Sequence, residues 1–138
     1  MANEWAKVEL YGANNDGCPR RFTIADGVSV SKGQTLVLSD PRTAAGGGAG
    51  LFDPCAGVAA MEKEANDGST SISVWTDGVF EAVASGAIAV GQAIMFADLN
   101  RVKAVNLSAS GAQMGAQVCG YALEAADNAE TINVRLRL

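Results

Sequence analysis

The chain contains no histidine, and this absence excludes a large group of enzyme mechanisms. Without His among its 138 residues, it has no Ser–His–Asp triad, no Cys–His pair and no imidazole base. Zinc sites that use His are excluded as well, and three scattered Cys are too few for a Cys₄ site. No glycine-rich loop is followed by the Lys and Ser/Thr of a phosphate-binding motif. We therefore expect no catalytic residues, no bound metal and no cofactor.

Positive charge is also scarce, which argues against nucleic acid as a partner. Ten Lys and Arg stand against 15 Asp and Glu, for a net charge of -5, and a protein that neutralises phosphates needs a basic face. Cations gather only at Arg20 and Arg21 and at Arg135 and Arg137. These groups are either solvated charges at strand edges or a local contact for an anion.

Long hydrophobic runs are missing. No apolar stretch approaches the ~20 residues of a membrane helix, and residues 1–7 lack the apolar run of a signal peptide. We expect no membrane partner and a protein made in a cytosol. There, Cys18, Cys55 and Cys119, which cannot all pair and form no CxxC motif, are expected to be reduced and mostly buried.

Aromatic residues make up only 6% of the chain, although 49% of it is hydrophobic. The core is therefore expected to consist of small side chains. Sixteen Gly argue against a helical bundle, because each Gly inside a helix costs about 1 kcal/mol. A chain of this length fits one ordinary domain.

Alternation of apolar and polar residues predicts many short strands. The stretch Trp5–Tyr11 alternates with period two, which is typical of a half-buried strand. Gly, Asn and Asp then mark breaks between further short segments. We predict an all-β fold with little helix, a small β-barrel or β-sandwich-like architecture. The other predicted strands are Arg21–Ile24, Thr35–Leu38, Ala56–Met61, Ser71–Trp75, Val79–Ala84, Ala93–Ala97, Val102–Val105, Val118–Leu123 and Thr131–Leu138.

One segment, Pro41–Pro54, has no periodic face and is rich in Gly. It predicts a long mobile glycine-rich loop, and loops of this length in compact domains are usually functional. Leu51 and Phe52 near its end are either an apolar anchor or the start of the next strand.

The chain contains an internal strand repeat. Residues 30–40 (VSKGQTLVLSD) match residues 88–98 (IAVGQAIMFAD) without a gap, and each copy carries a Gly–Gln pair. Downstream, Cys55–Glu62 matches Val118–Glu124, and Ser71–Val74 matches Thr131–Val134. The shared unit is a turn on Gly–Gln, a strand, a variable loop and a hairpin, in which Gly allows the positive φ that reverses the chain.

Paired carboxylates are the remaining route to catalysis. Asp77 is the best candidate, but Asp77–Gly78 also matches the commonest hairpin turn. We interpret Asp77 as a turn residue and expect no enzyme activity.

A family resemblance rests on short motifs: Gly57-Val-Ala, the turn at Asp67–Gly68, the stretch Ile72–Phe80, and Ala87–Gln92. From about residue 20 to the C-terminus, these resemble the capsid decoration, or cement, proteins of tailed bacteriophages. The resemblance implies a β-rich fold of the β-tulip type, often a homotrimer at three-fold positions. It also implies a virion protein on the outer capsid surface that bridges neighbouring major capsid subunits and so stabilises the shell.

On this reading, residues 1–19 form an N-terminal strand and loop that can dock on the capsid by adding to a strand edge. Residues 20–138 form the decoration domain, with similar halves at about 27–76 and 77–138. Large residues that can anchor an interface, or that simply pack in the core, are Trp5, Tyr11, Leu51, Phe52 and Trp75. The alternatives are a β-barrel binding module of a phage tail or host-surface component, recognising a small molecule or glycan, and a carboxylate-based enzyme.

Overall fold

The computed structural model describes residues 3–9, 19–40, 42–46, 54–97, 100–105 and 118–138. Across these residues the chain is all-β, as predicted. No helix in the described ranges is long and apolar enough to cross a membrane. The strands are β1 (Ala6–Glu9), β2 (Arg20–Thr23), β3 (Thr35–Asp40), β4 (Thr43–Gly46), β5 (Cys55–Ala59), β6 (Ser71–Trp75), β7 (Asp77–Val83), β8 (Ala93–Phe96), β9 (Val102–Ala104), β10 (Gly120–Ala122) and β11 (Thr131–Arg137).

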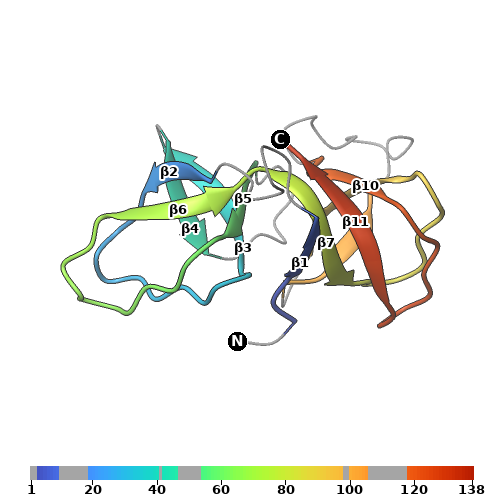
Figure 1. The fold of residues 1–138 in the computed structure, drawn as a ribbon, viewed down its shortest axis with the longest axis horizontal. Coiled ribbons are helices and arrows are strands. Elements are labelled where there is room, and N and C mark those ends of the chain that lie inside the picture. The colour runs from blue at the N-terminus through green and yellow to red at the C-terminus, as the bar shows by residue number, and fades with distance from the viewer. Residues whose placement is uncertain (1–2, 10–18, 41, 47–53, 98–99, 106–117) are drawn as a thin grey trace.

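The strands form two groups that lie side by side (Figure 1). Strands β2 to β6 form a closed barrel in the order β2-β4-β3-β5-β6, and the remaining strands form a sheet in the order β1-β7-β11-β10-β8-β9. The chain passes from the first group to the second at Thr76, between β6 and β7. We call the β2–β6 group the first half and the β7–β11 group the second half.

The two halves have the same strand connections. Strand β3 pairs with β4 and β5, and β5 pairs with β6, just as β8 pairs with β9 and β10, and β10 with β11. Parallel contacts complete both arrangements: Thr23 pairs with Thr43 in the first half, and Ala84 pairs with Val102 in the second. The second half thus repeats the barrel order of the first and adds β1 at the outer edge of β7.

The Gly–Gln turns of the repeat share their hydrogen bonds. Gly33 has φ +88° and Gly91 has φ +78°, so both need the left-handed backbone that only Gly adopts freely. The Gln34 side chain accepts a hydrogen bond from the N–H of Ser31 at 3.0 Å, and Gln92 accepts one from Ala89 at 3.0 Å. The two residues recur because the side-chain amide holds a turn that the Gly makes possible.

A second pair of repeated glycines lies where two strands approach closely. A Cβ on Gly57 would overlap the backbone carbonyl of Trp75, and a Cβ on Gly120 would overlap that of Arg135. Gly57 lies on β5 beside β6, and Gly120 on β10 beside β11. Each half therefore needs Gly here for a packing reason, not for a catalytic one.

Two hydrophobic clusters fill the interior. The cluster of the first half contains only aliphatic buried side chains: Ile24, Val30, Leu36, Ala44, Ala56, Ala59, Ile72 and Val74. The cluster of the second half contains Phe80 and Phe96, and it extends across to Trp5, Cys55 and Trp75. Cys55 and Cys119 are buried and form no disulfide, as predicted, and burial raises the pKa of the Cys119 thiol well above its ordinary value. Cys18 lies outside the described residues.

Three predictions need correction. The glycine-rich segment 41–54 is not entirely a loop, because Thr43–Gly46 forms β4 between β3 and β2. Small side chains are what let it fit there, and Ala44 is buried. Asp77–Gly78 is not a hairpin turn, because it begins β7, and β7 lies in a different sheet from β6.

The third correction concerns the N-terminal strand, which was predicted to be half-buried. All four residues of β1 are exposed. Its core contact comes instead from Trp5, which lies just before the strand.

Candidate docking surface

Trp5 joins the two halves. Its backbone N–H donates to the Gly33 carbonyl of the first half at 2.8 Å, and its indole Nε1 donates to the Asn100 carbonyl at 2.8 Å. The ring meets Phe96 edge-on at 5.5 Å between centroids and Phe80 at 6.0 Å, and only 4% of the residue is exposed. The N-terminal segment is thus fixed at a seam between the halves and does not hang free at that point.

Asn100 completes the seam with polar contacts. Its side-chain oxygen accepts hydrogen bonds from both the backbone N–H and the hydroxyl of Thr35, each at 3.1 Å. Both residues are buried, so these bonds remove the cost of unpaired polar atoms. Asn100 also has φ +60°, a conformation that Asn tolerates better than most residues. The halves are therefore held in one orientation by directional bonds as well as by apolar packing.

Trp75 lies at the end of β6, beside the crossing point between the halves. Its ring centroid is 5.6 Å from that of Phe80, and the ammonium groups of Lys7 and Lys32 lie 5.6 and 6.0 Å from it. Such cation–π contacts add modest stability at exposed sites. Trp75 thus links β1 and the Gly33 turn to the core of the second half.

The five predicted interface residues separate into two groups. Trp5 and Trp75 are 4% and 7% exposed and pack in the core. In this chain they can support a docking surface only by positioning it. Tyr11, Leu51 and Phe52 lie outside the described residues. Whether any of the five touches a partner stays a prediction.

Exposed apolar side chains mark other parts of the surface. The large ones among the described residues are Val8, Met61, Val90, Leu123 and Leu138. Val90 is the most exposed, at 67%, and it lies directly before Gly91 in the turn of the second half. The internal repeat shows that this residue has changed between the copies. Val90 aligns with Lys32, which is the residue before the turn glycine in the first copy. The second copy therefore has an exposed apolar side chain where the first copy has the charged Lys32.

The described residues contain no arrangement typical of catalysis or metal binding. No group of three or more Cys, Asp or Glu within them is placed to hold a metal ion. Asp77 is exposed at the start of β7, opposite Arg137 of β11. Two open hollows of about 420 and 450 Å³ lie at equivalent places in the two halves, the first lined by Gln92 and its neighbours and the second by Gln34 and its neighbours.

Lys63 is the one buried cation among the described residues. Its ammonium donates to the backbone carbonyls of Asp26, Val28 and Glu64 at 2.7 to 3.1 Å, and it lies 3.2 Å from the carboxylate of Asp67. The N–H of Ser69 and then Lys63 lower the pKa of that carboxyl. These contacts come from two loops, the one between β2 and β3 and the one between β5 and β6, so Lys63 fastens one loop to the other.

Comparison with known proteins agrees with a structural role. No curated protein matches the sequence. Among solved structures, the base of the head fiber gp8.5 N of bacteriophage phi29 has a similar fold, with a TM-score of 0.53 and 15% sequence identity. The match covers 86% of this chain and 92% of that one, so it includes both halves. The model of the phage cement protein family matches residues 17–138, and the chain therefore belongs to this family of phage capsid-associated structural proteins.

Proposed function

We propose that the protein decorates the outer surface of an icosahedral phage head and stabilises it by bridging neighbouring major capsid subunits, as a homotrimer. The observation that carries this proposal is the family match over residues 17–138. The likeness to a head fiber base supports a fold suited to the head surface. Because the proposed role is binding, no reaction is required, and none of the described residues forms a catalytic group.

The two-half architecture supports bridging. The halves carry the same strand order, and the Trp5–Asn100 seam fixes one against the other. A rigid molecule with two similar faces can contact two subunits at a set spacing, which opposes their separation. A flexible link between the halves would lose that effect, because it would allow each subunit to move alone.

Strand β1 supports docking by its edge. It is the last strand of its sheet, paired with β7, and all four of its residues are exposed. The outer backbone N–H and C=O groups of an exposed edge strand can pair with a strand from a partner. The proposal places a strand of the capsid subunit beside Ala6–Glu9, in agreement with the docking role expected for residues 1–19.

The test uses purified protein and phage heads that lack it. We expect the protein to sediment at three times the mass of its 14.1 kDa chain, to bind expanded heads, and to raise the temperature at which heads release their DNA. Soluble capsid subunits serve as the control and should bind far more weakly. Equal affinity for soluble subunits, or binding without any gain in head stability, contradicts the bridging role.

The contribution of β1 needs a variant that spares Trp5. Val8→Arg replaces the one large apolar side chain of β1, between the exposed Lys7 and Glu9, and three consecutive charges oppose strand addition. Val8→Thr is the matched control that keeps strand propensity. We expect the Arg variant to weaken head binding with an unchanged melting temperature of the free protein. If both variants bind as the wild type does, β1 is not the docking edge.

A further inference from the structure

The turn of the first half is already occupied by a segment of the chain itself, next to its N-terminus. The Trp5 N–H donates to the Gly33 carbonyl at 2.8 Å. A Cβ built on Gly33 would lie 2.6 Å from the Trp5 carbonyl oxygen and 3.0 Å from the Glu4 Cβ. Residues 4 and 5 therefore lie directly against the glycine, and Gly is needed there partly because this segment passes so close.

The equivalent turn of the second half is open. Gly91 has nearly the same φ as Gly33, and the two turns are fixed by the same bonds: Gly33 N–H to Ala59, and Gly91 N–H to Ala122, each at 2.8 Å. A Cβ built on Gly91, however, meets nothing within 4 Å in the described part of the chain. The geometry that receives a segment in one half is thus repeated in the other, where none of the described residues occupies it.

The residues around the Gly91 turn include exposed apolar side chains. Val90 replaces Lys32 of the first copy and is 67% exposed. Leu123 is 41% exposed, and it follows Ala122, whose N–H and carbonyl pair with Gln92 and Gly91. Two large exposed apolar side chains are therefore each one residue away from the hydrogen-bonded pair Gly91 and Ala122.

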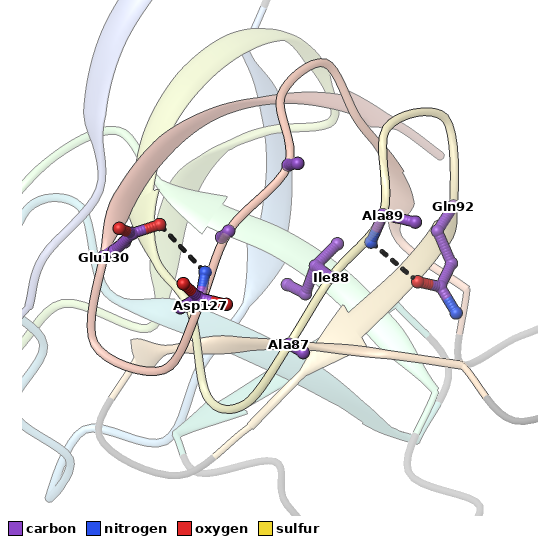
Figure 2. Close-up of a pocket in the computed structure, with 8 residues that line it drawn as sticks. Ala87, Ile88, Ala89, Gln92, Asp127 and Glu130 are labelled. Atoms are coloured by element: carbon purple, nitrogen blue, oxygen red, sulfur yellow. Dashed lines mark hydrogen bonds between the residues drawn. The ribbon is translucent and has the colours of Figure 1, made fainter.

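A hollow beside the turn provides further room. Figure 2 shows Ile88 within it, with Ala89 and Gln92 on one side and Asp127 and Glu130 on the other. Its volume is about 420 Å³, and four of the eight residues that line it are Ala. The Gln92 amide accepts from Ala89, and the Glu130 carboxylate from the Asp127 N–H, so both walls are held in place. An incoming chain meets a preformed surface, which reduces the ordering cost of binding.

We propose that the Gly91 turn is a docking site for an extended apolar segment of a capsid subunit, bound as residues 4 and 5 bind the Gly33 turn. A backbone N–H of that segment donates to the Gly91 carbonyl, and an apolar side chain covers Val90 and Leu123. The partner is not the N-terminus of a second copy, because that segment is already held by its own Gly33 turn and by Phe80 and Phe96. This inference rests on the proposed function and names the part of the molecule that performs it.

The test compares Val90→Arg with Met61→Arg on the full chain. Met61 is the matched control, because it is an exposed apolar residue of the first half, away from the Gly91 turn. Both variants change exposed side chains, so the melting temperature should stay that of the wild type. We expect Val90→Arg to weaken binding to phage heads at least about tenfold, which is about 1.4 kcal/mol, and Met61→Arg to change it less than about twofold.

A cross-linking measurement identifies the occupant. A photoreactive benzoylphenylalanine at position 90 should cross-link to the capsid subunit on decorated heads, and the same group at position 61 should not. Cross-links from position 90 only to another copy of this chain overturn the inference in favour of a contact between copies. If the wild type binds heads and Val90→Arg binds equally well, the inference fails while the proposed function stands. If the wild type does not bind heads, both fail.

Discussion

The two halves of the molecule share a fold and differ in what lies on their Gly–Gln turns. In the first half, the turn at Gly33 is covered by Glu4 and Trp5, and the neighbouring loops are fastened by a buried Lys63. In the second half, Gly91 is exposed, and no atom in the described ranges lies within 4 Å of a Cβ built there. Duplication thus supplied two equivalent surfaces, of which the chain uses one for its own stability.

The two halves also differ in the composition of their hydrophobic clusters. Aromatic rings from both halves and from the N-terminal segment meet in the second-half cluster, whereas the first-half cluster contains only aliphatic buried side chains. Because the aromatic cluster includes Trp5 and Trp75, the second half depends on contacts from outside its own strands. The following predictions test how far the halves are equivalent and where they are not.

The largest expected effect is that of Trp5→Ala. Removing a buried Trp costs about 3–5 kcal/mol, and here it also removes the indole hydrogen bond to the Asn100 carbonyl, one of the bonds that join the halves. We expect a loss of unfolding free energy in this range, measured by urea denaturation. Trp5→Phe retains an aromatic ring but lacks the indole N–H, and it should lose less. A loss below about 1 kcal/mol for the Ala variant contradicts the seam.

Substituting the two turn glycines tests directly whether the turns of the two halves differ in what lies against them. Gly33→Ala and Gly91→Ala each place an L-residue at positive φ, which costs about 1–2 kcal/mol. Only at Gly33 does the new Cβ also press against the Trp5 carbonyl, and such overpacking adds about 1–3 kcal/mol. Thermal denaturation should therefore show Gly33→Ala as the less stable variant. Equal losses would mean that the two turns are equally open.

Replacing Lys63 tests the contribution of its buried ammonium to stability. The second half has no such cation at the equivalent position, because Ala126 pairs with Ile88 as Lys63 pairs with Val30. Lys63→Met leaves the carbonyls of Asp26, Val28 and Glu64 without their donor, and we expect a loss of about 2 kcal/mol. The control is Lys32→Met, which removes an exposed cation over Trp75 and should cost less than about 1 kcal/mol. Similar losses for the two variants would show that burial of Lys63 contributes nothing.

The smallest effect concerns acid. The pKa of Asp67 is lowered by the Ser69 N–H and then by Lys63, from an ordinary value of 3.8. A carboxyl whose pKa is lower in the folded state stabilises the protein above the ordinary value, and this contribution is lost as the pH falls from 3.8 through the folded-state pKa. Asp67→Asn should flatten the dependence of melting temperature on pH below about 4. An unchanged slope would show that Asp67 is not linked to folding.

The sequence predicts much of the fold because the strand signal is local. The repeat and the alternation locate β3, β5, β6 and the strands that follow, and the Gly–Gln pairs indicate the two turns. Strand β4 was missed, because Thr43–Gly46 has no periodic pattern and becomes a strand only through bonds to β3 and β2. Pairing between distant segments is not visible in a short window.

The candidate docking surface is harder to predict for a similar reason. Large aromatic residues are the usual interface anchors, yet Trp5 and Trp75 are enclosed by segments from both halves. Val90 lies between two predicted strands, directly before Gly91, and a single Val there predicts no contact; its exposure is seen only in the structure. Comparing the two copies, rather than reading each alone, is what singles it out.

The most direct test of the account is a cryo-electron microscopy reconstruction of phage heads saturated with the protein. The account predicts that each chain contacts two neighbouring capsid subunits and that density from a subunit lies on the Gly91 turn, beside Val90, while the Gly33 turn holds only Glu4 and Trp5 of the same chain. Chains that each contact a single subunit, with the Gly91 turn facing solvent, would contradict it.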